Sequence, residues 1–493
     1  MQARGAPCSP GRRQVRIGVC HSQLCPGRSK MAQLIHGRCP RMLAKFLKSA
    51  LLGLCILIAL LVALYAISAR WPIPDAQRQA LAQIDQSPAA PPAGSNLFAA
   101  LWLLPYAVPA TEQNVVMARD LQRFANARTA AGFVSDAARY PRTPPWPAAA
   151  PPKCNWSTPD CLDKVRAQPQ AYADALMSQA PLLQRAATLS SRDYYRNLFP
   201  TRADTPLPEL QGLSVPMTQH ALDFVQGHQQ VALSGVCADA QVARVLLRGQ
   251  DTLIATMIGA AMLRGNAELF TGMLSELPST QPLPAHCQAA FAPLTMDETS
   301  LCGGLRGEAR LVSANYRAVV EAGGEQRRWY DRLVPPLLDV ERTRALTAPY
   351  YTWACHTDVR TQLEQDRKVP TSAIPAAPTV TFACIANAIG CLFADVEHMD
   401  SAQYQWQLQD LAATTRLTSA VLWLRAHPAE QQTLAQRLDQ LPATLIRPGR
   451  DITAGKDGKT LELPRYARND HANLQMPLAA SKVAQAAAMQ GKP

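Results

Sequence analysis

The sequence opens with a segment that has no acidic residue and continues into one that has no charge at all. Residues 1–48 contain ten lysines or arginines and no aspartate or glutamate, and residues 49–69 contain no charged side chain. The net charge of the whole chain is +12, but beyond residue 48 it holds 39 basic and 37 acidic residues. Basic charge confined to one short tail argues against a nucleic-acid-binding surface, so no nucleic-acid partner is predicted.

The sequence also lacks the short motifs that mark common catalytic and cofactor sites. It has no GxSxG elbow, HExxH pair, SxxK motif, phosphate-binding P-loop or GxGxxG turn. The run GGLRGEA at residues 303–309 has glycines before a helical pattern, but it lacks the lysine and the hydroxyl residue of a phosphate loop. No catalytic, cofactor-binding or metal-ligating residue is therefore predicted.

The uncharged run at residues 49–69 predicts a transmembrane helix. Its 21 residues, at about 1.5 Å per residue, would cross a hydrocarbon layer of about 30 Å. The apolar core of a cleaved signal peptide is shorter, at about 7 to 15 residues, although Ala66 and Ser68 offer small residues at a cleavage-like spacing. Length favours the uncut anchor, with the lipid bilayer as its partner. Cys55 follows Leu54 rather than a small residue, so it is expected to be an apolar filler.

The charge on either side of this helix predicts its orientation. Basic flanks remain in the cytoplasm, so the N-terminus is expected inside and the large remainder outside, which in a bacterial inner membrane is the periplasm. Residues 1–48 are predicted to be a disordered cytoplasmic tail. Four cysteines lie there without a CxxC pair, which makes a zinc site a weak hypothesis. Met31 or Met42 could be the true start of the protein.

The part beyond the anchor predicts a mainly α fold, an irregular multi-helix domain with a small C-terminal β-hairpin. Hydrophobic residues make up 48% of the chain, 40 prolines interrupt it, and no fixed-period repeat is present. Residues 70–94 read as a stalk and a Pro/Ala linker, and residues 95–474 as the domain, with a possible subdivision at the proline-rich loop 140–153. The long apolar pattern that contains Gly265 predicts one helix, or two that break there.

The C-terminal region carries the clear β signal. Asp457 and Gly458 form a turn signal between short apolar runs, which predicts a hairpin near residues 446–464. Residues 475–493 are expected to be a disordered tail.

Eight cysteines beyond the anchor are the strongest physical clue to the compartment. An even number suggests disulfides formed in an oxidising space, although eight cysteines permit about 105 pairings. The candidates are Cys154, Cys161, Cys237, Cys287, Cys302, Cys355, Cys384 and Cys391.

Only one pairing can be argued firmly from spacing. CNWSTPDC joins Cys154 to Cys161 through turn residues, which can bring the two Cα atoms within the roughly 4.4–6.8 Å that a bridge needs. Cys287 with Cys302 is a plausible second pair across a loop. CIANAIGC would hold its two cysteines too far apart if it were helical throughout, so either Gly390 breaks the helix or each cysteine pairs elsewhere.

Three groups deserve inspection as weak candidates for chemistry. His220, Asp223 and His228 have spacings that one helix could bring to a metal, and Glu397 with His398 could form an acid/base pair in the run DVEHMD, which also holds Asp395 and Asp400. Cys355 and His356 are adjacent, but neighbours on a helix or strand point apart, so a thiol nucleophile is not predicted. Solvated helix ends and caps explain these patterns as well.

The anchor, the proline-rich segment after it and NLFAALWLLPYAVP (residues 96–109) together resemble single-pass inner-membrane envelope proteins of proteobacteria. The resemblance implies an envelope location and no particular activity. NLFAALWLLPYAVP itself is too short to span a bilayer, so it is either a buried core helix or a membrane-surface segment. The C-terminal order of a long helix, a short helix and a hairpin is faintly similar to pseudopilin tails, but the pilin leader is absent and no pilin function follows.

The function expected from these observations is that of a membrane-anchored periplasmic binding or scaffold module, with an unknown envelope protein as its partner. The alternative is a periplasmic hydrolase or metal-dependent enzyme that uses His220, Asp223 and His228, or Glu397 and His398.

Overall fold

The structure is a computed structural model. It describes the following residues of the chain: 39–86, 94–127, 130–157, 160–249, 251–321, 334–376, 380–397, 401–429, 431–468 and 471–478. The chain divides into two compact units, Met1–Tyr65 and Ala66–Pro493. Of the tail predicted to be disordered, residues 1–38 lie outside the described residues, whereas residues 39–48 are helical.

The first unit is described from the start of helix α1 (Cys39–Ala69), which contains the predicted span. None of the residues in the most apolar window of α1 is buried. Large apolar side chains that point in different directions, such as Leu51, Leu52 and Leu54, are all exposed. A helix that is apolar on every side and covered by no protein is typical of a membrane span.

The second unit is mainly helical, as predicted. Its helices are α2 (Asp75–Asp85), α3 (Leu97–Leu103), α4 (Gln113–Asn126), α5 (Cys161–Ala167), α6 (Pro169–Met177), α7 (Ala180–Ala186), α8 (Val215–Val225), α9 (Gln229–Leu247), α10 (Leu253–Glu276), α11 (His286–Ala290), α12 (Met296–Thr299), α13 (Cys302–Glu321), α14 (Val334–Leu337), α15 (Val340–Thr352), α16 (Thr357–Glu364), α17 (Ala388–Val396), α18 (Ala402–Ala426) and α19 (Leu434–Leu438). Single 3-10 turns link several of them, among them η6 (Trp353–Cys355) and η8 (Phe382–Ile385).

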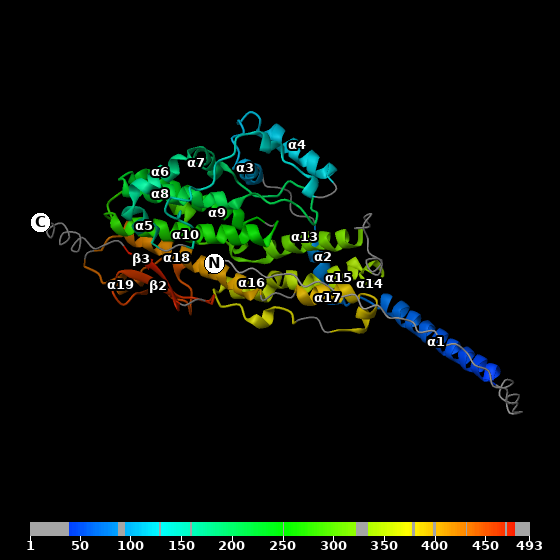
Figure 1. The fold of residues 1–493 in the computed structure, drawn as a ribbon. Coiled ribbons are helices and arrows are strands. Elements are labelled where there is room, and N and C mark those ends of the chain that lie inside the picture. The colour runs from blue at the N-terminus through cyan, green and yellow to red at the C-terminus, as the bar shows by residue number, and fades with distance from the viewer. Residues whose placement is uncertain are drawn as a thin grey trace, which may run out of the picture. The chain divides into compact units, whose positions relative to one another are not determined.

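The core of this unit forms around α9 and α10, which pack side by side (Figure 1). Helix α8 covers α9, and α18 covers α10. Helix α10 runs unbroken through Gly265, so the sequence pattern is one long helix rather than two. A side chain at Gly265 would overlap the backbone of Trp156, which shows that this glycine serves close packing and not a helix break.

Two segments near the start of the unit pack into its core, one contrary to the predicted stalk and one in agreement with the core-helix alternative. Helix α2 does not stand free as a stalk, because Ala80, Leu81 and Ile84 are buried and α2 packs against α15. Helix α3 is a core helix: Leu97 and Phe98 are buried, and the Asn96 side chain caps it by accepting a hydrogen bond from the Phe98 amide. The membrane-surface alternative for this segment is therefore not supported.

The C-terminal strands form a three-stranded antiparallel sheet of β1 (Thr453–Ala454), β2 (Thr460–Pro464) and β3 (Asn473–Pro477), in that order. The predicted hairpin is β1–β2, with Gly458 at φ +67° in its turn. Strand β3 was not predicted, and it lies partly in the segment expected to be disordered. Its alternation buries Leu474 and Met476, while residues 479–493 lie outside the described part of the chain.

An ionic cluster fixes the chain around the sheet to α18. The buried Arg450 pairs with Asp410 on α18 and with Asp366, at 2.9 Å from the latter, and donates through Nε to the Pro464 carbonyl. The Asp410 carboxylate also accepts hydrogen bonds from the backbone amides of Tyr466 and Ala467. Several partners for each buried charge offset the cost of removing it from water. The cluster therefore links three separate parts of the sequence.

Four disulfides cross-link the second unit. The predicted Cys154–Cys161 pair is present, with Cα atoms 5.7 Å apart. Cys287 and Cys302, which the sequence suggested as partners, each bond to another cysteine instead. Because α11 packs against α9, Cys287 meets Cys237, and Cys302 at the start of α13 meets Cys355 in η6.

Cys384 and Cys391 do bond to each other, with Cα atoms 5.8 Å apart. The helix break that allows this comes before α17, which starts at Ala388. Cys384 lies in the separate turn η8, and Gly390 lies inside α17 rather than at a break. The alternative of a broken helix is therefore correct, but the break lies before Ala388 and not at Gly390.

Candidate functional site

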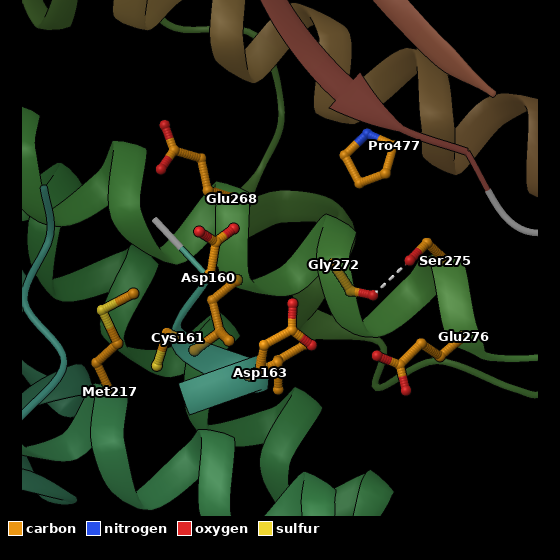
Figure 2. A pocket seen from close by; sticks show the side chains of 11 residues that line it. Asp160, Cys161, Asp163, Met217, Glu268, Gly272, Ser275, Glu276 and Pro477 are labelled. Atoms are coloured by element: carbon orange, nitrogen blue, oxygen red, sulfur yellow. Dashed lines mark hydrogen bonds between the residues drawn. The ribbon is translucent and has the colours of Figure 1, made fainter. Parts of the chain in front are cut away.

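A hollow of about 340 Å³ opens where α5, α8, α10 and the end of β3 meet (Figure 2). Its lining combines apolar side chains with four carboxylates. The apolar part comes from Leu162, Met217, Leu269 and Pro477, and the carboxylates are Asp160, Asp163, Glu268 and Glu276. The volume is at the low end of the range for small-molecule pockets, so the hollow suits one side chain or a small ligand group.

Local structure holds the acidic residues at this place. Asp160 precedes α5 in the left-handed conformation, with φ 60°. The neighbouring Cys154–Cys161 disulfide fixes the start of α5, and Gly265 lets the loop containing Trp156 lie directly on α10. Glu268 and Glu276 project from α10 about two turns apart, beside this loop.

One arginine neutralises part of this acidic charge. Arg166 on α5 lies 2.8 Å from both carboxylate oxygens of Glu276 and 3.0 Å from Asp163. The Glu268 carboxylate has no hydrogen bond or ion pair among the described residues. The Glu268 side chain is exposed at the hollow, but the protein around it still displaces water, and this desolvation raises its pKa although Arg264 and Arg465 lower it. Chemically, the arrangement can accept a cationic or hydrogen-bond-donating group.

No pattern in the sequence indicates this hollow. Asp160 and Asp163 come from one segment and Glu268 and Glu276 from another, far along the chain. Only the packing of α5 on α10 brings the two pairs together, and spacing along one segment cannot reveal such a contact.

The predicted histidine group is not assembled. His220 on α8 places Nε2 3.1 Å from Oδ2 of Asp239 on α9, and both side chains are largely buried. Asp223 accepts a hydrogen bond from Gln219 instead, and His228 is exposed before α9. Nowhere in the described ranges do three or more His, Cys, Asp or Glu side chains gather to hold a metal ion.

Glu397 lies in a different setting from the expected acid/base pair. The hydroxyls of Tyr316 and Tyr351 both donate to its Oε2. Burial raises the pKa of Glu397 although these two hydrogen bonds lower it, and burial together with Glu397 raises the pKa of both tyrosines. Asp395 is exposed on α17, whereas His398 and Asp400 lie outside the described residues. Glu397 is therefore the shared acceptor of two tyrosine hydroxyls.

The adjacent Cys355 and His356 do not form a thiol site, because Cys355 is bonded to Cys302. Comparison with known proteins adds no relative: no protein-family model, no curated protein and no solved structure matches this chain.

Proposed function

We propose that this protein is a membrane-anchored binding or scaffold module of the bacterial cell envelope, with α1 in the inner membrane, its N-terminus in the cytoplasm and the second unit in the periplasm. The observation that carries the proposal is α1, a long apolar helix without a buried residue in its most apolar window, followed by a disulfide-bonded helical unit.

The charge distribution and the cysteines support the orientation. The ten basic residues before residue 49 match a flank retained in the cytoplasm. The eight cysteines of the second unit are all paired, and Cys55, which is free, lies in α1. Disulfides persist in oxidising compartments such as the periplasm.

A binding role is supported by the acidic hollow between α5 and α10. Its carboxylates suit a lysine or arginine side chain of an envelope partner, which would add a second cation to that of Arg166. A module of this kind acts through what it holds near the membrane rather than through a reaction.

Reporter fusions test the topology. Alkaline phosphatase, which becomes active only after export, is fused after Leu478 in one strain and after Lys48 in another. We expect activity from the first fusion alone, and the reverse pattern for green fluorescent protein. Fluorescence from the fusion after Leu478 without phosphatase activity would contradict the proposal, as would eight alkylatable distal thiols in cells lysed without reductant.

A further inference from the structure

Helix α17 exposes an apolar face. Leu392 is 59% exposed and Val396 is 74% exposed, one turn apart on the same side of the helix as Ala388. The opposite side is covered, since Gly390 and Ala394 are buried and α17 packs against α15 (Figure 1). Asp395 is the only charged residue of the helix.

Two more exposed apolar residues precede α17. Val380 is 91% exposed and Ile385 is 43% exposed. The Cys384–Cys391 disulfide ties the turn η8, which contains Ile385, to α17. We call Val380, Ile385, Leu392 and Val396 the α17 face.

Near the α17 face, the second unit holds its own first residues, the stretch from Ala66 that continues from the apolar run. The Ser68 hydroxyl donates a hydrogen bond to the Phe382 carbonyl at 2.8 Å and accepts one from the Ala386 amide at 3.0 Å. The ring of Trp71 lies 5.2 Å from that of Phe382. Helix α17 starts two residues after Ala386, and its nine residues extend about 14 Å at about 1.5 Å each.

We propose that the α17 face lies in the headgroup layer of the bilayer that α1 spans, so that its partner is a lipid surface. This inference rests on the proposed membrane anchoring of α1. Exposed apolar side chains on one face of a short helix suit the boundary between headgroups and acyl chains. Trp71, half exposed at the end of the span, is the residue type enriched at that depth, and the neighbouring exposed Arg70 can reach lipid phosphates.

Continuity with α1 distinguishes lipid from the other possible occupants. An apolar face elsewhere on the unit could serve a protein partner, but this one adjoins the residues that leave the membrane. The second contact would fix how the unit stands on the bilayer, since one helix alone leaves it free to tilt.

Photo-crosslinking to lipid tests this proposal on the full chain in nanodiscs of phosphatidylethanolamine and phosphatidylglycerol. A photoreactive amino acid is introduced singly at positions 392, 396, 231 and 58. Val231 on α9 is the matched control, because it is 62% exposed on a helix that lies away from α17 (Figure 1). Ile58 in α1 reports on the anchor itself. Retention of the four disulfides, measured by mass, verifies that each variant folds.

We expect phospholipid adducts at positions 58, 392 and 396, and none at 231. Adducts at 58 without any at 392 or 396 would overturn the α17 contact and leave the anchor standing, whereas their absence at 58 would overturn the proposed function. Equal adducts at 231, or adducts between two protein chains at 392 and 396 in place of lipid, would also overturn the lipid contact.

Discussion

Helices α1 and α9 are both long and apolar enough to cross a membrane, yet they have different surroundings. In the most apolar window of α1 no residue is buried, whereas 67% of that of α9 is buried inside the second unit. Helix α9 contacts α8, α10 and α11, and a disulfide joins it to α11. Length and composition alone therefore do not distinguish a span from a core helix.

The two helices differ in whether they carry charged side chains that can pair with neighbouring elements. Helix α9 carries Asp239 and Arg244, which find partners in His220 and Glu298. Between residues 49 and 69, α1 has no charged side chain. A helix with a few buried, paired polar groups belongs to a protein core, because lipid could not satisfy them. Matched substitutions should therefore destabilise the protein when they are made in α9 and leave its stability unchanged when they are made in α1.

The largest effect is expected from truncating a buried leucine of α9. Leu246→Ala should lower the free energy of unfolding by about 2–5 kcal/mol, because Leu246 is fully buried and a cavity would remain. Leu57→Ala, on the exposed surface of α1, should leave it unchanged. Urea denaturation of the full chain in detergent, followed by near-ultraviolet circular dichroism, measures both. Equal losses would end the distinction between the two helices.

Removing the disulfide of α9 should have the next largest effect. Cys237→Ala combined with Cys287→Ala opens a bridge between residues 50 apart in sequence, which should cost about 2–4 kcal/mol of stability because the unfolded chain gains freedom. Cys55→Ala in α1 is the control and should not move the urea midpoint. An unchanged midpoint in the double variant would show that the bridge does not hold α11 on α9.

A glycine in each helix gives a smaller and sharper comparison. A methyl group at Gly235 in α9 would overlap the His220 ring, so Gly235→Ala should destabilise the second unit by about 1–3 kcal/mol. At Gly53 in α1 nothing lies within 4 Å, and Gly53→Ala should be tolerated. The same denaturation experiment measures both, and a neutral Gly235→Ala would mean that α8 and α9 are less tightly packed than described.

The smallest effect is a dependence on pH that α1 cannot supply, since residues 49–69 contain no carboxylate. Burial raises the pKa of Glu397 above its usual value of 4.5. The folded protein therefore binds a proton more readily than the unfolded chain, and Glu397 contributes stability that is lost as pH rises through its folded pKa. Other buried carboxylates contribute similarly, so the test compares variants.

Wild type and Glu397→Gln should differ in how steeply their stability depends on pH. As pH falls from about 7 to about 5, wild type should gain more stability than the variant, because only wild type can take up a proton at this position. The urea midpoint measured at both values gives the difference. A variant with the same gain as wild type would exclude Glu397 as a contributor.

Features that depend on short stretches could be predicted from the sequence. The apolar helix follows from an uninterrupted run, the β1–β2 hairpin from Asp457 and Gly458, and the Cys154–Cys161 pair from the turn residues between them. Each of these is determined by residues close together in the chain, whose own conformational preferences are strong.

Features that depend on contacts between distant segments could not. Strand β3 offers only Leu474 and Met476 as apolar residues, too weak an alternation to recognise without β2 beside it. The loop between Cys287 and Cys302 suggested that these two cysteines are partners, but the packing of α11 on α9 decides the pairing. The acidic hollow has the same origin, since its two pairs of carboxylates meet only through the packing of α5 on α10.

The disulfides follow one simple order: in the second unit, each cysteine is bonded to the next one along the chain. A polypeptide threaded outward from its N-terminal side would present these thiols two by two. An oxidase that joins each newly emerged thiol to the one waiting before it would then produce the native set without reshuffling. Maturation of a chain exported in this way would require an oxidant, and the native pairing would need no isomerase to correct mistakes.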